Sequence, residues 1–346
     1  MSLTQNIREK CVELGFDLVG FAPARRAVHA DRFLEWLEQG HHADMAWLER
    51  DPERRADPRV VLEDTRSLIV VGQSYYTEDP PSDIWDDPTR GKVARYAWGR
   101  DYHKVMTPRL KRLAAWLDDE VKQELQFRAY VDTGPVLERD FGALAGLGFI
   151  GKNSLLITPE YGSYVFLGQM LVNLELDFDE PGDAKGTCGS CTRCLDLCPT
   201  HAFPAPYVVD SRKCISYLTI ECRQPIEETL RRQMGRWIFG CDECQSVCPW
   251  VKQFARPRDE HWLSLDPNHA APRLDELLGL DDEGFLNRFA GTPLMRPKRR
   301  GLLRNAAIAA GNSGCTDLIP ALEMALQDSE PQVREHAAWA IDRLQK

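Results

Sequence analysis

The sequence predicts three consecutive regions: a mixed helix-and-strand (α+β) domain over residues 1–180, a small cysteine-rich module over 181–256 and an all-helical region over 257–346. Three observations support this division. Helical and strand-like apolar patterns alternate in the first half, nine of the 11 cysteines lie between positions 188 and 248, and one helical pattern recurs in the tail. A chain of 346 residues is long enough for two or three such domains.

The first region is predicted to contain a sheet with helices packed on it. The spacing of apolar residues predicts helices over 7–14 and 109–124, and Pro135 suits the first turn of a helix that runs to about Gly146. Runs of β-branched and aromatic residues predict strands over residues 17–22, 67–76, 127–131 and 164–174. No G-x-G-x-x-G turn follows a predicted strand and no G-x4-G-K-[ST] loop occurs, so dinucleotide and P-loop sites have no support.

Composition and charge narrow the possible functions. Apolar residues make up 43% of the chain, but the longest apolar stretches are far too short to span a bilayer. The polar N-terminus does not have the pattern of a signal peptide, and clustered thiols without an export signal predict a cytoplasmic location. A net charge of −10 argues against general coating of nucleic acid.

The most informative motif is the run C-x2-C-x2-C-x3-C-P, formed by Cys188, Cys191, Cys194, Cys198 and Pro199. This spacing lets three thiolates hold one iron–sulfur cluster while the fourth reaches a second cluster. A zinc ribbon would need two separated cysteine pairs, and disulfides would need an oxidising compartment. The spacing therefore predicts a ferredoxin-like module that carries electrons.

A second run, C-x2-C-x3-C-P, contains Cys241, Cys244 and Cys248. Ile238 occupies the position of its first cysteine, so either Cys214 or Cys222 must complete the set. In the swapped ferredoxin arrangement, the ligands of one cluster are Cys188, Cys191, Cys194 and Cys248, and those of the other are Cys198, Cys241, Cys244 and, as the preferred choice, Cys214. The distant Cys11 and Cys315 are expected to be buried as apolar residues.

The tail carries an internal repeat and a basic stretch. The pattern L-R-x2-A-x2-A at Leu303 recurs as V-R-x2-A-x2-A at Val333, 30 residues later. This indicates a HEAT-like repeat, with an ordinary helical hairpin as the alternative. No acidic residue occurs between Arg288 and Thr316. The basic side chains expected to contact nucleic-acid phosphates, unless the stretch is only a solvated loop, are Lys298, Arg299, Arg300 and Arg304.

Four other segments are informative in combination with the cysteine runs. They read ARYAWGRDYH at 94–103, VDTGPVLER at 131–139, GLGFIGKN at 146–153 and KRRGLLRNA at 298–306. Together they resemble the epoxyqueuosine reductases over nearly the whole chain, although each piece alone would be weak. The resemblance implies an enzyme that removes the epoxide oxygen of epoxyqueuosine at the wobble position of tRNA, in the last step of queuosine synthesis.

The resemblance also implies cofactors and a fold. Cobalamin would lie in a nitroreductase-like N-terminal domain beside two [4Fe–4S] clusters, a layout similar to that of the reductive dehalogenases. No local motif announces the corrinoid. Reduction of an epoxide to an alkene consumes two electrons, which clusters can deliver one at a time, so a low-potential electron donor is expected. The protein is expected to act as a monomer.

Individual residues take roles from the same resemblance. Asp132 matches the general acid that the departing oxygen needs, although an aspartate before Thr-Gly-Pro also suits a helix cap. Tyr102 and His103 would line the cobalamin or substrate pocket, with core packing as the alternative. Lys152 and Asn153 would hold corrin amides or the nucleotide tail, unless they form a solvated turn. The basic tail would grip tRNA.

Two other functions are compatible with the cysteine pattern. One is an iron–sulfur reductase of a small molecule, with cobalamin or flavin. The other is a non-catalytic electron-transfer scaffold whose helical tail docks a partner protein. A requirement for tRNA in turnover would argue against the first, and a corrin absorbance in the purified protein would argue against the second.

Overall fold

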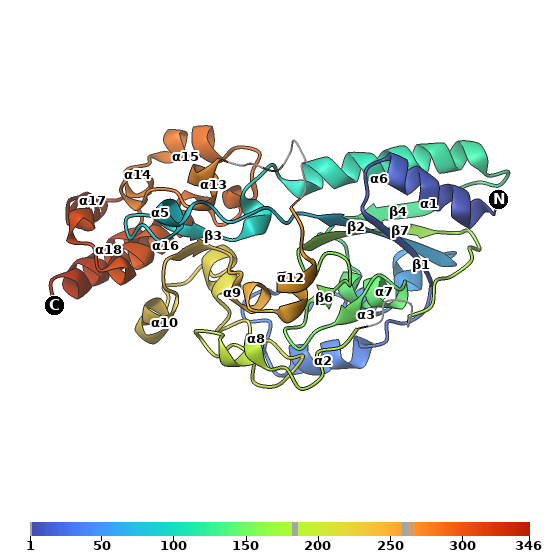
Figure 1. Cartoon of the computed structure of the whole chain (residues 1–346), viewed down its shortest axis with the longest axis horizontal. Coiled ribbons are helices and arrows are strands. Elements are labelled where there is room, and N and C mark those ends of the chain that lie inside the picture. The colour runs from blue at the N-terminus through green and yellow to red at the C-terminus, as the bar shows by residue number, and fades with distance from the viewer. Residues whose placement is uncertain (1, 182–185, 258–262, 264–265) are drawn as a thin grey trace.

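The computed structural model describes residues 2–181, 186–257, 263 and 266–346. Figure 1 shows two lobes, one containing the N-terminus and a sheet flanked by helices, the other helical and containing the C-terminus. The cysteine-rich segments, with α8, α9 and α12, lie between them in this view. The boundaries predicted between the three regions, after residues 180 and 256, lie within two residues of the stretches 182–185 and 258–262, which are not described.

The sheet has four antiparallel strands in the order β1 (Leu18–Pro23), β2 (Ser67–Ser74), β7 (Val165–Val172) and β4 (Phe127–Tyr130). Strand β2 pairs along its whole length with β7, from Ser67 opposite Val172 to Ser74 opposite Val165. Successive side chains of a strand point to opposite faces. Accordingly, Ile69 and Val71 enter one apolar cluster, whereas Leu68 and Val70 enter another.

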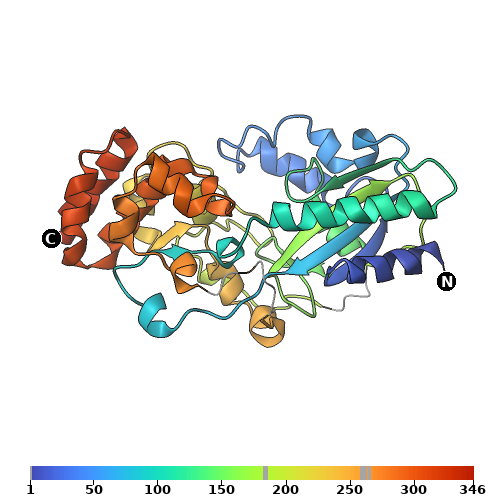
Figure 2. The same ribbon diagram turned by 90° about the horizontal axis from the view of Figure 1, so that it is seen from above.

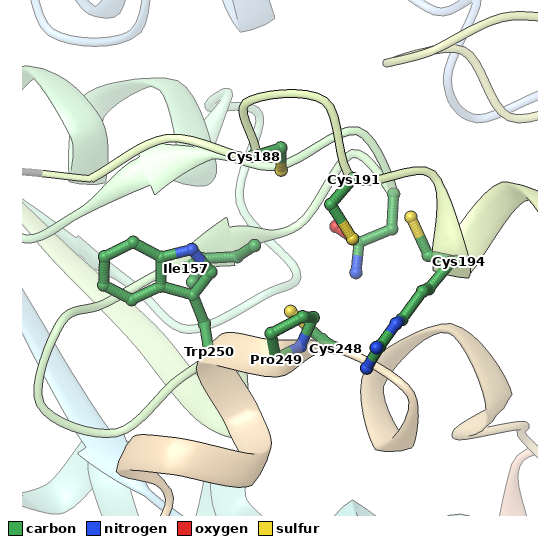
Figure 3. A pocket seen from close by; sticks show the side chains of 9 residues that line it. Ile157, Cys188, Cys191, Cys194, Cys248, Pro249 and Trp250 are labelled. Carbon is green, nitrogen blue, oxygen red and sulfur yellow. The ribbon is translucent and has the colours of Figure 1, made fainter.

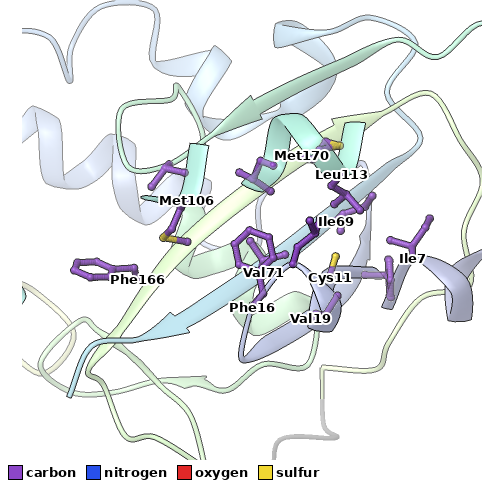
Figure 4. Close-up of a cluster of buried hydrophobic side chains, with 14 of the residues drawn as sticks. Ile7, Cys11, Phe16, Val19, Ile69, Val71, Met106, Leu113, Phe166 and Met170 are labelled. Atoms are coloured by element: carbon purple, nitrogen blue, oxygen red, sulfur yellow. The ribbon is translucent and has the colours of Figure 1, made fainter. Parts of the chain in front are cut away.

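The first face of the sheet is covered by α1 (Leu3–Glu13) and the long α6 (Tyr102–Glu120). Figure 4 shows Ile7 and Cys11 of α1 and Met106 and Leu113 of α6 gathered over this face. Figure 2 shows the same two helices lying along the strands. Cys11 is fully buried among these apolar side chains, as expected.

Shorter elements cover the second face. Phe141 and Leu144 of α7 (Glu138–Leu144) pack on Leu68 and Leu171. Further elements at this side of the sheet are α2 (Ala30–Glu38), α3 (Pro52–Ala56), α4 (Pro58–Val61) and the small hairpin of β5 (Phe149–Ile150) with β6 (Leu156–Ile157). The connection from β4 through α7 to this hairpin carries the motifs at 131–139 and 146–153.

The cysteine-rich module contains five short helices: α8 (Arg193–Asp196), α9 (Ile215–Ile220), α10 (Glu228–Gln233), α11 (Glu243–Ser246) and α12 (Pro249–Phe254). All except α10 begin within two residues of a cysteine. Its strand β8 (Trp237–Phe239) pairs in parallel with β3 (Lys92–Val93) from the first half of the chain. Near this pairing lie α5 (Ser82–Trp85) and the 3-10 turn η1 (Arg95–Ala97).

The C-terminal lobe contains α13 (Pro267–Ala270), α14 (Leu274–Leu278), α15 (Asp282–Phe289), η2 (Pro293–Met295), α16 (Lys298–Ser313), η3 (Thr316–Leu318), α17 (Ile319–Ala325) and α18 (Pro331–Leu344). The repeated positions face each other where α16 packs on α18: Ala307, Ala310, Ala337 and Ala340 are all fully buried. Close approach is required here, because a Cβ at Gly311 would lie 2.9 Å from Ala340. Cys315 is only half-buried, less than expected.

The predicted strands lie where expected, whereas the three helices predicted in the first region differ in their bounds. Helix α1 begins at Leu3, four residues before position 7, and α6 ends at Glu120, four residues before position 124. Helix α6 begins at Tyr102, earlier than position 109, because Asp101 caps it by accepting from the His103 N–H (3.0 Å) and Pro108 is tolerated inside. Helix α7 begins at Glu138, three residues after Pro135. No helix in the described part of the chain is long and apolar enough to cross a membrane.

Candidate active site and cluster module

Four cysteines of the two runs surround one cavity. The cavity has a volume of about 130 Å³, and its lining includes Cys188, Cys191, Cys194 and Cys248, together with Asn153, Ile157, Arg193, Pro249 and Trp250. Figure 3 shows the four sulfur atoms around this space, with Cys248 approaching from the opposite side to the first run. All 11 cysteines of the chain are free thiols. The structure thus brings together the four residues predicted for one cluster.

The other predicted ligands are neighbours at a second position. Burial raises the pKa of the Cys244 thiol, and the nearby Cys214, Cys194 and Cys198 raise it further. Burial likewise raises the pKa of Cys241, where Cys244 and Cys214 add to the effect. As thiols these groups would hold their protons, so binding of iron must displace them.

Cys222, the alternative to Cys214, lies in a different environment. Its sulfur donates to the Gln224 carbonyl (3.5 Å), and it packs with Ile215, Leu218 and Met234 in an apolar cluster. Cys214, in contrast, is among the groups that raise the pKa of Cys241 and Cys244.

Lys152 and Asn153 are tied to the cysteine loops. The Lys152 ammonium donates to the carbonyls of Gly189 (2.8 Å) and Cys191 (3.0 Å), and its backbone N–H donates to the Cys188 sulfur (3.4 Å). The Asn153 amide donates to the Cys244 carbonyl (3.3 Å). Hydrogen bonds to ligand sulfurs tune the potential of an iron–sulfur cluster. These contacts link the turn after β5 to both cysteine runs.

Asp132 occupies the loop between β4 and α7 in a left-handed backbone conformation, with φ of +59°. Non-glycine residues adopt this conformation uncommonly, aspartate more readily than most, and strained residues of this kind cluster at active sites. Its carboxylate accepts from the Tyr102 hydroxyl (3.0 Å) and lies 3.8 Å from the His103 Nε2. The side chain is 64% exposed, so it is open to a ligand.

The partners of Asp132 are held in place by stacking and hydrogen bonds. The Tyr102 ring stacks on His103 (4.2 Å between centroids) and on Phe166 (4.1 Å). His103 Nδ1 lies 2.8 Å from Asp101 Oδ1, which favours the tautomer with the proton on Nδ1. His103 Nε2 is then left buried without a hydrogen-bond partner among the described residues. Burial raises the pKa of Tyr102, so this hydroxyl remains a donor.

Two further residues form hydrogen bonds with the backbone of the Asp132 loop. Glu138 accepts a hydrogen bond from the Asp132 N–H (2.8 Å), and burial followed by the charge of Asp132 raises its pKa to about 8. The Arg55 guanidinium donates to the Gly134 carbonyl (3.3 Å) in the same loop. Sequence reasoning missed both residues, although Glu138 lies inside the motif at 131–139.

Comparison with known proteins agrees with this combination of sites. A family model described as epoxyqueuosine reductase QueG, DUF1730, matches residues 55–133, and one described as a 4Fe-4S double cluster binding domain matches residues 187–251. The epoxyqueuosine reductase of Xanthomonas campestris pv. campestris is 40% identical over 97% of this chain and 94% of its own length. That of Escherichia coli K12 is 38% identical over 98% of this chain and 89% of its own length.

The chain belongs to the epoxyqueuosine reductase family.

Solved structures of epoxyqueuosine reductases have the same fold. One with an epoxyqueuosine-modified tRNA-Tyr stem loop superposes with a TM-score of 0.89 at 31% identity, covering 99% of this chain and 90% of its own. One from Streptococcus thermophilus gives a TM-score of 0.89 at 30% identity, with the same coverage. The prediction of a double [4Fe–4S] module is therefore confirmed for this epoxyqueuosine reductase.

One predicted tRNA contact is wrong. Arg304 is only 1% exposed, and its guanidinium donates to the backbone carbonyls of Leu218 (2.7 Å), Cys222 (2.9 Å) and Gln224 (3.0 Å). These carbonyls satisfy the buried charge, so the side chain cannot reach a phosphate. Arg299 is largely covered too, because Asp328 and the Leu280 carbonyl accept from it. Lys298 is exposed and Arg300 half-buried.

Proposed function

We propose that this epoxyqueuosine reductase reduces epoxyqueuosine to queuosine at the wobble position of tRNA, with Asp132 as the general acid. The main support for this proposal is the grouping of Asp132, Tyr102 and His103 in the same molecule as a two-cluster electron-transfer module. A solved relative carries an epoxyqueuosine-modified tRNA stem loop. The reaction takes two electrons and two protons and releases the epoxide oxygen as water.

We propose the following cluster ligands. Cys188, Cys191, Cys194 and Cys248 hold one [4Fe–4S] cluster in the cavity that they line. Cys198, Cys214, Cys241 and Cys244 hold the other. Two observations support this division: the electrostatic proximity of Cys214 to Cys241 and Cys244, and the apolar packing of Cys222. Cys194 also lies near Cys244, so the two clusters would be neighbours and could exchange electrons.

The residues present suit cobalamin beside Asp132. This fit is supported by the buried His103 Nε2, which has no hydrogen-bond partner among the described residues and faces the Asp132 carboxylate. His103 and Tyr102 would hold the corrinoid or the substrate at this point. When bound, cobalamin supplies a strongly reducing cobalt centre. Lys152 and Asn153 would border the corrinoid while fixing the cysteine loops.

The residues of the chain itself would then act on protons and orientation. Asp132 delivers a proton to the departing oxygen, because an alkoxide leaves poorly without one. The Tyr102 hydroxyl holds the Asp132 carboxylate by donating to Oδ2. Glu138 holds the Asp132 backbone in its left-handed conformation. A Bacillus subtilis relative is described with its catalytic aspartate loop swung out of the active site; Asp132 would occupy such a loop here.

The sheet lobe would be nitroreductase-like and bind cobalamin, and the paired α16 and α18 would form a HEAT-like unit. Exposed Lys298 and half-buried Arg300 would meet tRNA phosphates, with Arg299 at their edge. A low-potential donor would pass electrons to the clusters of a monomer in the cytoplasm.

Asp132→Asn tests the proposal at its chemical step. In anaerobic single-turnover reactions with epoxyqueuosine-containing tRNA, the variant should lose about 10²–10⁴-fold in rate and keep its iron and cobalamin content. Asp118→Asn, which changes an exposed carboxylate of α6, serves as the matched control and should react normally. Near-normal rates for Asp132→Asn would remove this residue from the mechanism.

A further inference from the structure

An aromatic and a cationic side chain meet beside the Asp132 loop from distant parts of the chain. Trp47, between α2 and α3, is 38% exposed, although most tryptophans of a folded protein are covered. The Arg296 guanidinium, just before α16, lies 5.6 Å from the centre of the Trp47 ring. We call these two side chains the Trp47–Arg296 patch.

The structure holds Arg296 in place. Glu221 accepts from both Nε (2.8 Å) and Nη2 (3.2 Å) of Arg296, a two-pronged contact. Arg223 donates to the Arg296 carbonyl (3.2 Å). The Glu221 side chain is only 17% exposed, whereas that of Arg296 is 56% exposed, so the guanidinium is anchored on one side and open on another. An ordered cation loses little further freedom when it binds a ligand.

The patch is connected to the catalytic loop. Arg55 donates to the carbonyl of Trp47 (3.5 Å) and to that of Gly134 (3.3 Å), two residues after Asp132. The hydrogen bond with Glu221 raises the pKa of Arg296, and the charge of Asp132 raises it further, which places Arg296 within electrostatic range of the proposed acid. Trp47 and Arg296 therefore lie close to the Asp132 loop.

The chemistry of this pair fits a single-stranded nucleotide. An exposed indole provides a flat face for base stacking, and stacking of this kind tolerates any base. A guanidinium beside it matches a phosphate group. A wobble base that reacts at Asp132 must leave its stack, and its neighbours in the loop then need a new surface. Exposed Lys298, two residues after Arg296, adds a second positive charge in this segment of the chain.

We propose that the Trp47–Arg296 patch stacks an unpaired anticodon-loop nucleotide adjacent to the wobble base, with Trp47 against the base and Arg296 against its phosphate. This inference rests on the proposed function, because it takes tRNA as the substrate. It adds a specificity-determining surface outside the reacting group. The patch would hold the loop open while the substrate base enters the site.

The test measures binding of a fluorescent anticodon stem loop to the full-length reconstituted protein. Loss of one base–aromatic stack should weaken binding by roughly 5- to 150-fold. Trp47→Ala should show this loss, Trp47→Phe should retain most of the affinity, and Met324→Ala, an exposed apolar residue of α17, should be unchanged. Arg296→Gln should weaken binding and reduce its salt dependence.

A matched change in the RNA identifies the contact. Stem loops are prepared with an abasic nucleotide on one or the other side of the wobble position. With the stem loop that lacks the base stacked on Trp47, wild-type protein and Trp47→Ala should bind the RNA equally, since the stack is already lost. A Trp47→Ala penalty that persists with abasic nucleotides on either side would overturn the inference. So would unchanged stem-loop binding together with slower reduction by a protein electron donor, which would make the patch a donor-docking surface. Wild-type protein that neither binds nor reduces tRNA would instead overturn the proposed function.

Discussion

Cys214 and Cys222 lie eight positions apart and differ in their surroundings, which gives a direct test of the cluster ligands. Cys214 is near Cys241 and Cys244, whereas Cys222 packs among apolar side chains. Cys214→Ser should lower the iron content after anaerobic reconstitution from about eight to about four per chain. Cys222→Ser should keep about eight. The reverse result would reassign the ligand.

The raised pKa of Glu138 predicts that the stability of the protein depends on pH. Its pKa is raised from 4.5 to about 8 in the folded protein. Between these values the unfolded chain loses this proton and the folded chain keeps it, so the free energy of unfolding falls as pH rises. Glu138→Gln keeps an oxygen for the Asp132 N–H and removes this titration. Melting temperatures from pH 5 to 8.5 should therefore fall less in this variant than in wild type.

A control for the Glu138 prediction comes from its neighbour. The charge of Asp132 is the second cause of the raised pKa. Asp132→Asn should therefore also flatten the dependence on pH, by a smaller amount. If the melting temperatures of wild type and Glu138→Gln fall equally with pH across this range, Glu138 does not titrate there.

The motifs allowed some candidate site residues to be predicted and gave no sign of others. Asp132, Tyr102 and His103 were predictable because each lies inside a recognisable segment, and the structure brings them together. The burial of Arg304 was not predictable, because arginine is rarely buried and its three carbonyl partners come from positions 218–224. Arg55 was missed for a similar reason, since its contact with Gly134 spans 79 residues.

At the scale of elements, His336 fixes α18 to the cysteine-rich module. Its Nε2 accepts from the Ile226 N–H (3.3 Å) and its Nδ1 lies 2.7 Å from the Gln332 carbonyl, so only the neutral ring with a proton on Nδ1 satisfies both contacts. Burial, and then the charge of Arg231, lower its pKa from 6.5 to about 4. A buried neutral histidine of this kind makes the packing of α18 sensitive to acid.

The expected acid sensitivity follows from the sign of this shift. As pH falls from about 6.5 to 4, the unfolded chain binds a proton that the folded chain does not, so stability falls by up to about 3 kcal/mol. His336→Gln should show a shallower loss over this range in urea unfolding followed by tryptophan fluorescence. An equally steep loss in the variant would place the acid-sensitive group elsewhere.

Arg304 and its basic neighbours on α16 should behave in opposite ways. Arg304→Met removes the guanidinium that donates to three backbone carbonyls, of which those of Leu218 and Cys222 are buried, and should destabilise the protein by about 3 kcal/mol or more. Lys298→Ala with Arg300→Ala should leave the melting temperature nearly unchanged but weaken tRNA binding, with a log–log salt slope lower by about 1 for each lost phosphate contact. An unchanged dissociation constant across a salt titration would show that tRNA binds elsewhere.

Local sequence patterns predicted the long helices and strands well, because the pattern that specifies each of them lies within its own residues. The eight-residue strands β2 and β7 follow runs rich in β-branched and aromatic residues, and the helices α1 and α6 follow apolar residues at helical spacing. The two-residue strand β3 was not predictable. It exists only because Lys92 and Val93 pair with β8, about 145 positions later in the chain.

At the scale of the whole molecule, the core does not follow the three sequential regions. The apolar cluster of the helical lobe contains Val93 and Trp98 from the first region, Ile238 and Phe239 from the second, and Leu302 and Ala337 from the third. Residues 92–98 therefore join the lobes together. This joining places Arg296 of the tail within electrostatic range of Asp132, an arrangement that no linear division predicts.

In the proposed reaction, this chain couples cluster electrons to proton delivery at a tRNA base. The most direct measurement is nucleoside analysis after anaerobic incubation of fully reconstituted protein with epoxyqueuosine-containing tRNA and a low-potential reductant. We expect one queuosine to form for every two electrons consumed, and no product from protein without clusters. Unchanged epoxyqueuosine in the tRNA, with two clusters and cobalamin bound and reduced, would contradict it.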